Sequence, residues 1–360
     1  MKKKQDDDRI YGLTPEQFTD KHKQAKAAEY KRNAKQTVPK LAHFDCFDVD
    51  TYPDLGKTVE LPPVPYGKRL FPLFNTINIE TTSWCNFKCK FCPAAFLDRP
   101  HNAMSDDVYT KIIDELAAID YTGDIKLHQS NEPMTDPKIY ERVEYAREKT
   151  VCPVGFYSNG FKIDRLALHK LYKAGLNFLG VEAYVSKKQF DELLKIFMEL
   201  RDFHDDVTVH YQTEDGGYSY ADVKGSFKRR GMYITLSRRY PKRDDDADKF
   251  FEYNKSKITS RCGVLPSRMS TKATNMCVRP FRKMQVNWDG KVVLCCEEWL
   301  YNKGAMMGDL KKNSIVEVWN GKPFFEMRHM LQNHKRDKYP CNQCNFNGGT
   351  WATNVRRVKL

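Results

Sequence analysis

Three closely spaced cysteines carry the residue type and spacing of a reactive metal centre. Cys85, Cys89 and Cys92 have the spacing C-x3-C-x2-C in the segment ETTSWCNFKCKFCPAAF. Three thiolates on one short loop can hold three irons of a [4Fe–4S] cube and leave the fourth iron open to another ligand. A structural zinc ion, completed by a fourth ligand such as His101, is the alternative. The open iron makes this segment the first candidate for chemistry.

A second group of cysteines lies near the C-terminus. Cys277 and Cys295 are separated by 17 residues, and the C-x2-C pair Cys341 and Cys344 follows 45 residues later. Four thiolates that flank a hairpin and a helix can close on one metal centre. That centre is either a fully ligated iron–sulfur cluster or a structural zinc ion. Cys296 adjoins Cys295 and is an alternative ligand.

The remaining cysteines and the bulk composition indicate a protein of a reducing compartment. The 360-residue chain has 11 cysteines, and the segment MKKKQDDDRI lacks the apolar stretch of a secretory signal. Reducing conditions favour thiolates over disulfides, so we expect a cytoplasmic protein without a membrane span. We expect Cys46, Cys152 and Cys262 to be small buried hydrophobic residues.

The formal charge of +13 is unevenly distributed. Residues 224–243 hold 8 Lys or Arg and no Asp or Glu. Such a patch can face an anionic substrate or nucleic acid, and an ordinary solvated basic face explains it as well. Nucleic acid is therefore a possible partner that the sequence does not favour.

The elements that must position these cysteines alternate between short apolar runs and amphipathic stretches. This pattern is typical of βα units and a parallel sheet. The predicted strands are Asn75–Thr81, Gly123–Gln129, Val154–Tyr157, Phe178–Ala183, Val207–Gln212 and Met232–Leu236. The predicted helices are Asp106–Ile119, Pro137–Glu148, Ile163–Ala174, Lys187–Phe203 and Tyr220–Arg229. Chemistry is expected on the loops that follow the first four strands, because barrels of this kind carry their sites at the C-terminal strand ends.

The predicted fold class is α/β, with four segments. Residues 1–71 form a basic N-terminal extension, and residues 72–257 form a partial (β/α)6 TIM-like barrel. Residues 258–348 form a small Cys-rich α+β domain, in which MQVNWDGKVVLCC predicts a β-hairpin that turns at Trp288-Asp289-Gly290. Residues 349–360 form a basic C-terminal tail.

The first cysteine motif, on the loop after a first barrel strand, resembles that of the radical S-adenosylmethionine (SAM) superfamily. The resemblance implies that Cys85, Cys89 and Cys92 hold a [4Fe–4S] cluster whose open iron binds SAM. In that family, reductive cleavage of SAM yields a 5′-deoxyadenosyl radical that abstracts hydrogen from a substrate. An external electron donor of the flavodoxin or ferredoxin kind is then an expected partner.

Further matches to the family suggest residues that bind SAM. Phe91 matches a position that packs near the adenine. Ser130-Asn131-Glu132-Pro133 resembles the family's Gly-Gly-Glu-Pro turn, with both glycines replaced, and implies that Glu132 meets the SAM ammonium group. Ser158 and Asn159 resemble the Thr-Asn-Gly turn that reaches the ribose or the methionine part, although an ordinary Asn-Gly turn has the same sequence. The cofactor-binding set implied in this way is Phe91, Ser130, Asn131, Glu132, Pro133, Ser158 and Asn159.

The second cysteine group resembles the twitch domain, the one-cluster relative of the SPASM domain. The resemblance implies one auxiliary [4Fe–4S] cluster held by Cys277, Cys295, Cys341 and Cys344. The full SPASM pattern has further cysteines for a second cluster, and this chain has none after Cys344.

A radical initiator with one auxiliary cluster suits a two-electron oxidation, so the resemblance favours dehydrogenation of a sugar-like or cyclitol-like alcohol. A peptide-modifying maturase, an RNA-modifying enzyme and a non-enzymatic metal-binding protein are the alternatives. A dehydrogenase needs a general base for the hydroxyl proton. The candidates near strand ends are Glu182, Tyr184, His210 and Glu214.

Overall fold

A computed structural model describes the chain over nine segments: residues 59–61, 73–89, 91–214, 218–221, 231–239, 259–265, 277–300, 305–346 and 355–357. The chain divides into two units, which are described separately. The barrel–auxiliary unit contains residues 44–156 and 241–360. The small unit contains residues 157–240 together with residues 1–43.

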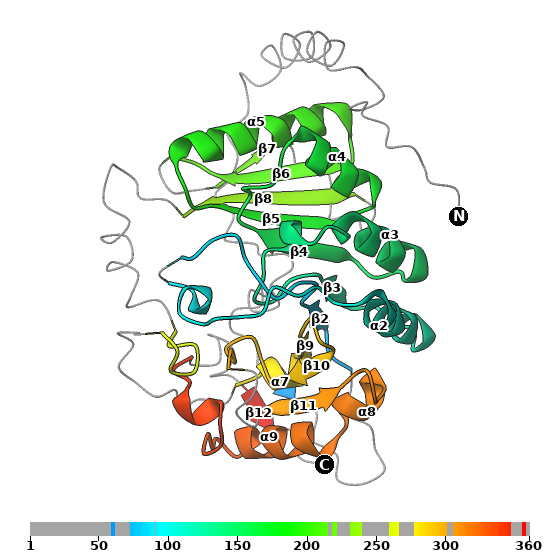
Figure 1. Cartoon of the computed structure of the whole chain (residues 1–360), viewed down its shortest axis with the longest axis vertical. Helices are drawn as coiled ribbons and strands as arrows, with labels where there is room; N and C mark the ends of the chain where they lie inside the picture. Colours follow the sequence, from blue (N-terminus) through cyan, green and yellow to red (C-terminus); the bar gives the residue numbers. More distant parts are fainter. Residues whose placement is uncertain are drawn as a thin grey trace. The chain divides into compact units, whose positions relative to one another are not determined.

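Strands and helices alternate through most of the described chain (Figure 1). The strands are β1 (Val59–Leu61), β2 (Thr76–Ile79), β3 (Asp124–Lys126), β4 (Val154–Ser158), β5 (Phe178–Ala183), β6 (Val207–Gln212), β7 (Tyr218–Ala221), β8 (Met232–Arg238), β9 (Lys283–Val286), β10 (Lys291–Val293), β11 (Met306–Asp309) and β12 (Val355–Arg357). The α-helices are α2 (Asp106–Ala118), α3 (Ile139–Lys149), α4 (Arg165–Lys173), α5 (Lys187–Phe203), α7 (Arg279–Arg282), α8 (Ile315–Trp319) and α9 (Lys322–Gln332). Three short 3-10 helices are η2 (Pro93–Ala95), η3 (Pro133–Thr135) and η4 (Cys341–Gln343).

The barrel–auxiliary unit is built on a mixed sheet with the order β11-β10-β9-β2-β3-β4. Strand β2 runs parallel to both β3 and β9, and β3 runs parallel to β4. The loops after β2, β3 and β9 therefore leave the same edge of the sheet, where parallel α/β folds carry their ligands. Because β9 pairs with β2 from Thr76↔Lys283 to Ile79↔Val286, the C-terminal segment extends the sheet that carries the first cysteine motif.

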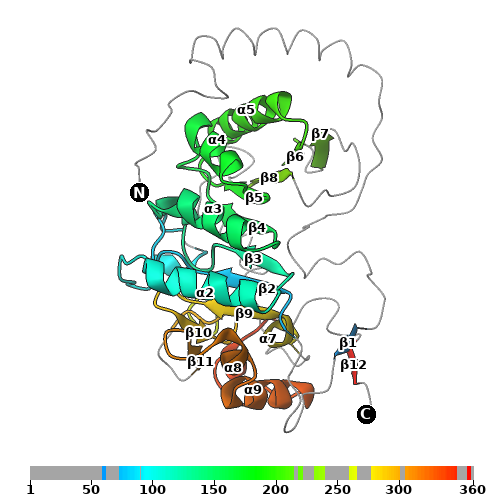
Figure 2. The same cartoon turned by 90° about the vertical axis from the view of Figure 1, so that its right-hand side faces the viewer.

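Helices α2 and α3 cover the strands of this unit, as Figure 2 shows for α2 beside β2 and β3. Asp106 and Asp107 occupy the first turn of α2, where carboxylates interact favourably with the helix dipole. Its buried residues recur at helical spacing and are Val108, Tyr109, Ile112, Ile113 and Leu116. The Tyr109 hydroxyl donates to the carbonyl of Arg142 in α3 at 2.6 Å, which joins the two helices.

The predicted hairpin is confirmed as β9 and β10, which are antiparallel. Gly290 lies in the turn with φ +80°, a conformation that glycine adopts without strain. After β11, Ser314 and Glu317 form a capping box that begins α8. Helices α8 and α9 both pack against β11.

Arg328 of α9 is buried among aromatic rings. Its guanidinium carbon lies 3.9 Å from the ring centroid of Trp319 and 4.6 Å from that of Phe324. It donates to the carbonyl of Pro280 at 2.9 Å and to that of Trp319 at 2.7 Å. One side chain thus joins α7, α8 and α9.

Replacing Arg328 by Ala is expected to lower the free energy of unfolding. Two buried carbonyls would lose their donor, and each unsatisfied group costs about 1–3 kcal/mol. Urea denaturation would measure this loss. Lys322→Ala, on an 86% exposed side chain of the same helix, is the matched control and should change the free energy by less than about 0.5 kcal/mol. Equal free energies of unfolding for the two variants would contradict a stabilising role of Arg328 between α7, α8 and α9.

The small unit has the strand order β5-β8-β6-β7, with β8 parallel to β5 and β6, and β7 antiparallel to β6. The predictions of β5, β6 and α5 match the observed bounds. Helix α5 packs along the sheet, begins at the cap Ser186, whose side chain accepts from the Gln189 amide, and buries Phe190, Leu193, Ile196, Phe197, Glu199 and Leu200.

The predicted helix Tyr220–Arg229 is wrong at its start, because Tyr220 and Ala221 belong to β7. Backbone pairing of β7 with β6 overrides the helical spacing of the sequence there. The rest of that predicted helix lies outside the described residues. So do most of the N-terminal extension and most of the C-terminal tail, apart from the parallel pair β1 and β12. None of the described helices has the length and apolarity to cross a membrane.

Candidate active site

The first cysteine motif forms an irregular loop between β2 and η2. Cys85, Cys89 and Cys92 are each half-buried. The Cys92 amide donates to the Cys89 carbonyl at 2.9 Å, and the Phe87 amide donates to the Cys85 sulfur at 3.4 Å. Hydrogen bonds from backbone amides to a sulfur atom stabilise a thiolate ligand. The loop therefore fits the three-thiolate set predicted from the spacing.

Cationic side chains surround this loop. Burial raises the pKa of the Cys92 thiol, while the charges of Arg261, Arg99 and Lys88 act to lower it. Arg99 forms a buried two-bond ion pair with Glu80, at 2.9 and 2.8 Å, and also donates to the Ser130 carbonyl at 3.0 Å. Arg99 thus fastens the loop after β2 to the loop after β3. The positive surroundings favour thiolates and other anionic groups.

The predicted Ser130-Asn131-Glu132-Pro133 turn lies directly beside the cysteine loop. The Glu132 amide donates to the Trp84 carbonyl at 3.0 Å, and the Asn131 amide group donates to the Thr82 hydroxyl at 3.2 Å. The Glu132 carboxylate is buried and accepts from the Met134 amide at 3.1 Å, so it begins η3 at Pro133.

The Ser130 hydroxyl oxygen is buried without a hydrogen-bond partner among the described residues. A buried polar group of this kind normally has a partner, so its orphan state fits a ligand that would supply one. This observation supports the predicted binding of SAM at the turn. Phe91 lies half-buried on the neighbouring loop.

In the small unit, the predicted Ser158-Asn159 pair forms a tight turn after β4. The Ser158 hydroxyl accepts from the Gly160 amide at 3.0 Å, and the Asn159 side chain accepts from the Phe161 amide at 3.0 Å. Gly160 has φ +73°, and a Cβ there would lie 2.8 Å from both Leu193 and Val181. The geometry accounts for an Asn-Gly turn, and contact with SAM stays a prediction.

The four candidate bases also lie in the small unit, and the structure brings two of them together. Glu182 accepts from Tyr184 and forms an ion pair with Arg239 at 2.6 Å. His210 is buried, with its Nδ1 atom 3.0 Å from the Tyr233 hydroxyl. The Glu214 side chain is 78% exposed, with an oxygen 3.7 Å from the Lys187 ammonium. None of them is thereby assigned as the base.

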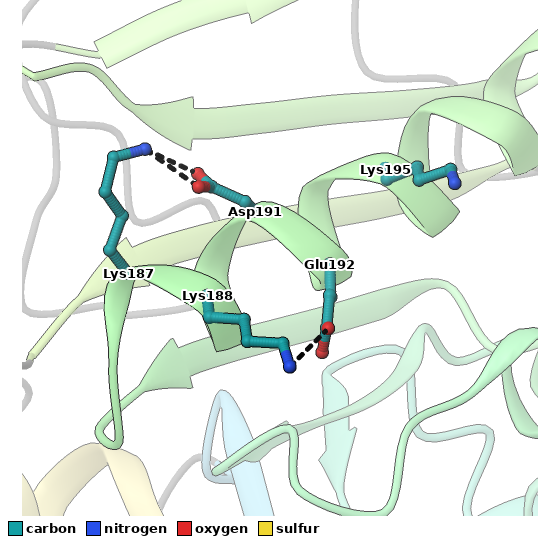
Figure 3. A pocket seen from close by; sticks show the side chains of 5 residues that line it. All are labelled: Lys187, Lys188, Asp191, Glu192 and Lys195. Carbon is teal, nitrogen blue, oxygen red and sulfur yellow. Dashed lines mark hydrogen bonds and ion pairs between the residues drawn. The ribbon is translucent and has the colours of Figure 1, made fainter.

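A depression on α5 is lined by charged side chains, and Figure 3 shows how they pair. Lys187 contacts Asp191 at 2.8 Å, and Lys188 contacts Glu192 at 3.9 Å. These are exposed contacts four residues apart on one helix, which add little stability. We interpret the depression as a solvated helix face.

The second cysteine group converges on one cavity of the barrel–auxiliary unit. Cys277, Cys295, Cys341 and Cys344 are all buried and all line it. Cys341 begins η4 and Cys344 follows its last residue, and the Cys344 amide donates to the Cys341 carbonyl at 3.3 Å. Burial raises the pKa of Cys277 to about 11 and also raises that of Cys295. A bound metal would offset this cost of ionisation, so the four thiols fit a metal centre.

Cys262 lines the same cavity, which the sequence did not indicate. The prediction that Cys262 is buried is confirmed, but its neighbours are thiols rather than an apolar core. A hydrogen bond from Cys262 lowers the pKa of Cys344 to about 7, and the same bond raises that of Cys262. Cys152 is buried and donates to the Tyr121 carbonyl at 3.0 Å, while Cys46 lies outside the described residues.

Cys296 is half-buried and is not among the residues that line the cavity. Cys295 is therefore the member of the pair that faces the other thiols. No three Cys, His, Asp or Glu side chains of the described chain gather closely enough to hold a single metal ion. The thiols surround a cavity rather than one point.

A buried ion cluster beside this cavity was missed by the sequence analysis. Glu297 accepts from Arg279 at 2.7 Å, from Arg261 at 3.0 Å and from the Thr259 hydroxyl at 2.5 Å. Burial acts to raise the pKa of Glu297, but the two guanidinium groups outweigh it and lower the pKa. Glu297 therefore stays ionised. Its position two residues after Cys295 is the only signal that the sequence offers.

Arg261 also interacts electrostatically with Cys92 and with Cys296. Burial disfavours its charge, but Glu297, Cys296 and Cys92 favour it, and its pKa is raised. Cys92 belongs to the first cysteine motif, and Cys296 adjoins the auxiliary cavity. Arg261 thus lies within electrostatic reach of the first cysteine motif, and its ion pair with Glu297 joins it to a residue that lines the auxiliary cavity.

Comparison with family models decides the kind of protein. A model of the radical SAM superfamily matches residues 79–184, and a model of the SPASM iron–sulfur cluster-binding domain matches residues 277–345. The chain carries a radical SAM domain followed by a SPASM domain. The radical SAM domain implies a [4Fe–4S] cluster that binds SAM, and the SPASM domain implies auxiliary iron–sulfur chemistry. The expected order of initiator and auxiliary segments is confirmed, and the chain is a radical SAM enzyme.

Known proteins are similar to this one along most of the chain. The S-adenosyl-L-methionine-dependent 2-deoxy-scyllo-inosamine dehydrogenase of Niallia circulans is 24% identical over 278 residues, which cover 76% of this chain and 93% of the relative. A crystal structure of BtrN with AdoMet and 2-DOIA is 19% identical, covers 78% of this chain and 96% of that chain, and has a TM-score of 0.58. A second BtrN structure, in an open conformation, is 19% identical, covers 76% of this chain and 93% of that chain, and has a TM-score of 0.50. The chain shares the fold of these structures.

Proposed function

We propose that this radical SAM enzyme dehydrogenates one secondary alcohol of a small cyclitol-like or sugar-like molecule. The similar curated protein is a dehydrogenase of 2-deoxy-scyllo-inosamine, and the similarity extends over nearly its whole length. A substrate of that chemical class carries hydroxyl groups and C–H bonds next to oxygen. Both features match a polar site close to a radical source.

Two sets of cysteines would hold the clusters. Cys85, Cys89 and Cys92 would hold the initiator, and the auxiliary cluster would use the four buried thiols, which are Cys277, Cys295, Cys341 and Cys344. When bound, the clusters supply reductive cleavage of SAM to a hydrogen-abstracting radical and an acceptor for the second substrate electron. A flavodoxin-like or ferredoxin-like protein would supply the first electron.

One observation carries the proposed oxidation: Glu297 lines the auxiliary cavity, and its ion-pair partner Arg261 interacts electrostatically with Cys92 of the first cysteine motif. The negative charges of the Cys92 and Cys296 thiolates raise the pKa of Arg261. Glu297 is one of the residues that line the auxiliary cavity. A substrate held there would be within reach of the initiator and the auxiliary centre. That arrangement suits the removal of a hydrogen atom and then of an electron from one molecule.

The ion pair suits recognition of hydroxyl groups. The Glu297 carboxylate can accept from a substrate hydroxyl, and Arg261 can donate to a substrate oxygen. The two arginines that keep Glu297 ionised also make it a weak base. We therefore assign Glu297 to substrate orientation rather than to proton removal, and Glu182, Tyr184, His210 and Glu214 stay predicted candidates for the base.

Anaerobic assay with 2-deoxy-scyllo-inosamine and related aminocyclitols tests this function. The expected products are one 5′-deoxyadenosine and one ketone per SAM consumed. Substrate deuterated at the reacting carbon should transfer its label to 5′-deoxyadenosine. The control is the same substrate deuterated at a different carbon, which should transfer none. SAM cleavage that no polyol stimulates but a peptide does would contradict the proposal and favour a maturase.

A further inference from the structure

The predicted SAM-binding turn, residues 130–133, is held by hydrogen bonds with neighbouring segments. The turn contains no glycine, and Ser130 and Asn131 are not among the described residues with a positive φ. The Asn131 side chain donates to the Thr82 hydroxyl at 3.2 Å, and the Ser130 carbonyl accepts from the Arg99 guanidinium at 3.0 Å. A hydrogen bond from a charged donor is stronger than one between neutral groups. Arg99 is therefore the partner that we expect to stabilise the turn more.

Arg99 is itself oriented by Glu80, the residue that follows β2. The Nη1 and Nη2 atoms of Arg99 donate to the two carboxylate oxygens of Glu80 at 2.9 and 2.8 Å. The Arg99 and Glu80 side chains are 9% and 0% exposed, so water competes little for these bonds. Nη1 carries two N–H bonds, and it donates to Glu80 and to the Ser130 carbonyl at once. Because two parallel bonds fix the plane of a guanidinium group, Glu80 determines where Arg99 presents its remaining donor.

Glu80 is held in turn by the segment that the SPASM family model matches. The Glu80 amide donates to the Val286 carbonyl at 2.8 Å, and the Glu80 carboxylate accepts from the Trp288 amide at 3.4 Å. The guanidinium carbon of Arg99 lies 5.7 Å from the ring centroid of Trp299, which is within the range of a cation–π contact. These contacts join the SPASM segment, through Glu80 and Arg99, to the predicted SAM-binding turn.

We propose that Arg99 is a positioning residue for SAM: oriented by Glu80, it holds the Ser130 carbonyl and keeps residues 130–133 in the conformation that receives the cofactor. The proposal rests on the assignment of SAM to this turn, which the buried Ser130 hydroxyl supports because it has no partner among the described residues. A site that is already ordered binds its ligand more tightly, since no ordering cost is added on binding. Loss of Arg99 should therefore weaken SAM binding without removing a cluster ligand.

The test is equilibrium dialysis of radiolabelled SAM with the reconstituted full-length enzyme, without reductant and without substrate, so that no SAM is cleaved. Arg99→Met keeps an unbranched side chain and removes the donors. We expect the dissociation constant for SAM to rise about tenfold, the effect of losing one charge-assisted hydrogen bond. The iron content should remain at about eight per chain. With reductant and saturating SAM, 5′-deoxyadenosine should form at close to the wild-type rate, because the variant loses affinity rather than a reacting group.

Arg328→Met is the matched control, because Arg328 is also a buried arginine of this unit and also donates to carbonyls, those of Pro280 and Trp319. It should lower the free energy of unfolding and leave the affinity for SAM unchanged.

The double variant Glu80→Gln, Arg99→Met also removes the carboxylate that Arg99→Met alone leaves unpaired, which protects the fold. It should show the same weakened SAM binding. Wild-type affinity in either Arg99 variant, or an equal loss of affinity in Arg328→Met, would overturn the proposal. A fall to about four irons per chain in both Arg99 variants would assign Arg99 to support of the cysteine loop and would overturn it as well. Because no polyol is present in the dialysis, a failure of the proposed dehydrogenation would leave this result standing.

Discussion

The triple variant Cys85→Ala, Cys89→Ala, Cys92→Ala is expected to lose about half of its iron and all SAM-dependent chemistry. The wild-type enzyme with one initiator and one auxiliary [4Fe–4S] cluster should contain about eight irons per chain, and the variant about four. Without the three thiolates, nothing in the loop presents an open iron to SAM. Iron analysis after anaerobic reconstitution, followed by dithionite-driven conversion of SAM to 5′-deoxyadenosine, measures both effects.

The converse variant separates the two centres. Cys277→Ala with Cys341→Ala removes two thiols of the auxiliary cavity and leaves the loop after β2 intact. We expect it to keep the initiator cluster and some SAM cleavage, and to lose the oxidised product. Cys152→Ala is the control for loss of a buried thiol and should retain all activities. SAM cleavage by the triple variant would contradict the assignment of the initiator centre. A wild-type content of about four irons and one zinc per chain would contradict the assignment of the auxiliary centre.

The bounds of β5, β6 and α5 could be predicted to the residue because the signals for these elements lie within their own sequences and the residues next to them. Helix α5 has a serine cap and a buried face at helical spacing, and β5 opens with the buried run Phe178–Val181. The segment at Tyr220 failed because its strand depends on backbone pairing with β6, which local spacing does not encode.

The convergence of Cys277, Cys295, Cys341 and Cys344 on one cavity could also be predicted, since their spacing along the chain is itself the signal. The Arg99–Glu80 and Arg261–Glu297 pairs were not predictable in this way. Their partners are 19 and 36 residues apart, and nothing in the local sequence distinguishes a buried carboxylate from an exposed one. The pairing of β9 with β2 is similarly long-range, and it brings the SPASM segment to the edge that carries the first cysteine motif.

The substitution Glu297→Gln is expected to reduce oxidation of the substrate strongly while SAM cleavage without substrate continues. Glutamine keeps the shape but lacks the negative charge that faces Arg261 and Arg279. Removing one partner of a buried, hydrogen-bonded charge pair typically costs about 2–5 kcal/mol. If that cost falls on substrate binding, kcat/KM for the polyol should decrease roughly 30-fold or more, at 1.36 kcal/mol per tenfold. Quantifying 5′-deoxyadenosine and ketone side by side measures how far the two reactions become uncoupled.

Loss of an ion pair that only supports the fold would also lower activity. The free energy of unfolding of Glu297→Gln must therefore be measured together with its activity. Glu298→Gln is the matched control: Glu298 is equally buried, but it accepts from the Tyr339 hydroxyl at 2.9 Å and the Leu300 amide at 2.9 Å. The Glu298→Gln variant should form 5′-deoxyadenosine and ketone in the same ratio as the wild-type enzyme.

The double variant Arg261→Met, Glu297→Gln decides between substrate recognition and scaffolding. Replacing both partners of a buried pair is often neutral for stability, whereas breaking the pair costs about 3–5 kcal/mol. In Glu297→Gln both Arg261 and Arg279 face a neutral side chain, whereas in the double variant only Arg279 of these two does. We therefore expect the double variant to be at least as stable as Glu297→Gln alone in urea denaturation, yet to remain defective in oxidation. Recovery of oxidation together with stability would mean that the pair only supports the fold. Continued loss of oxidation in a stable protein would instead assign Arg261 and Glu297 to recognition of the substrate.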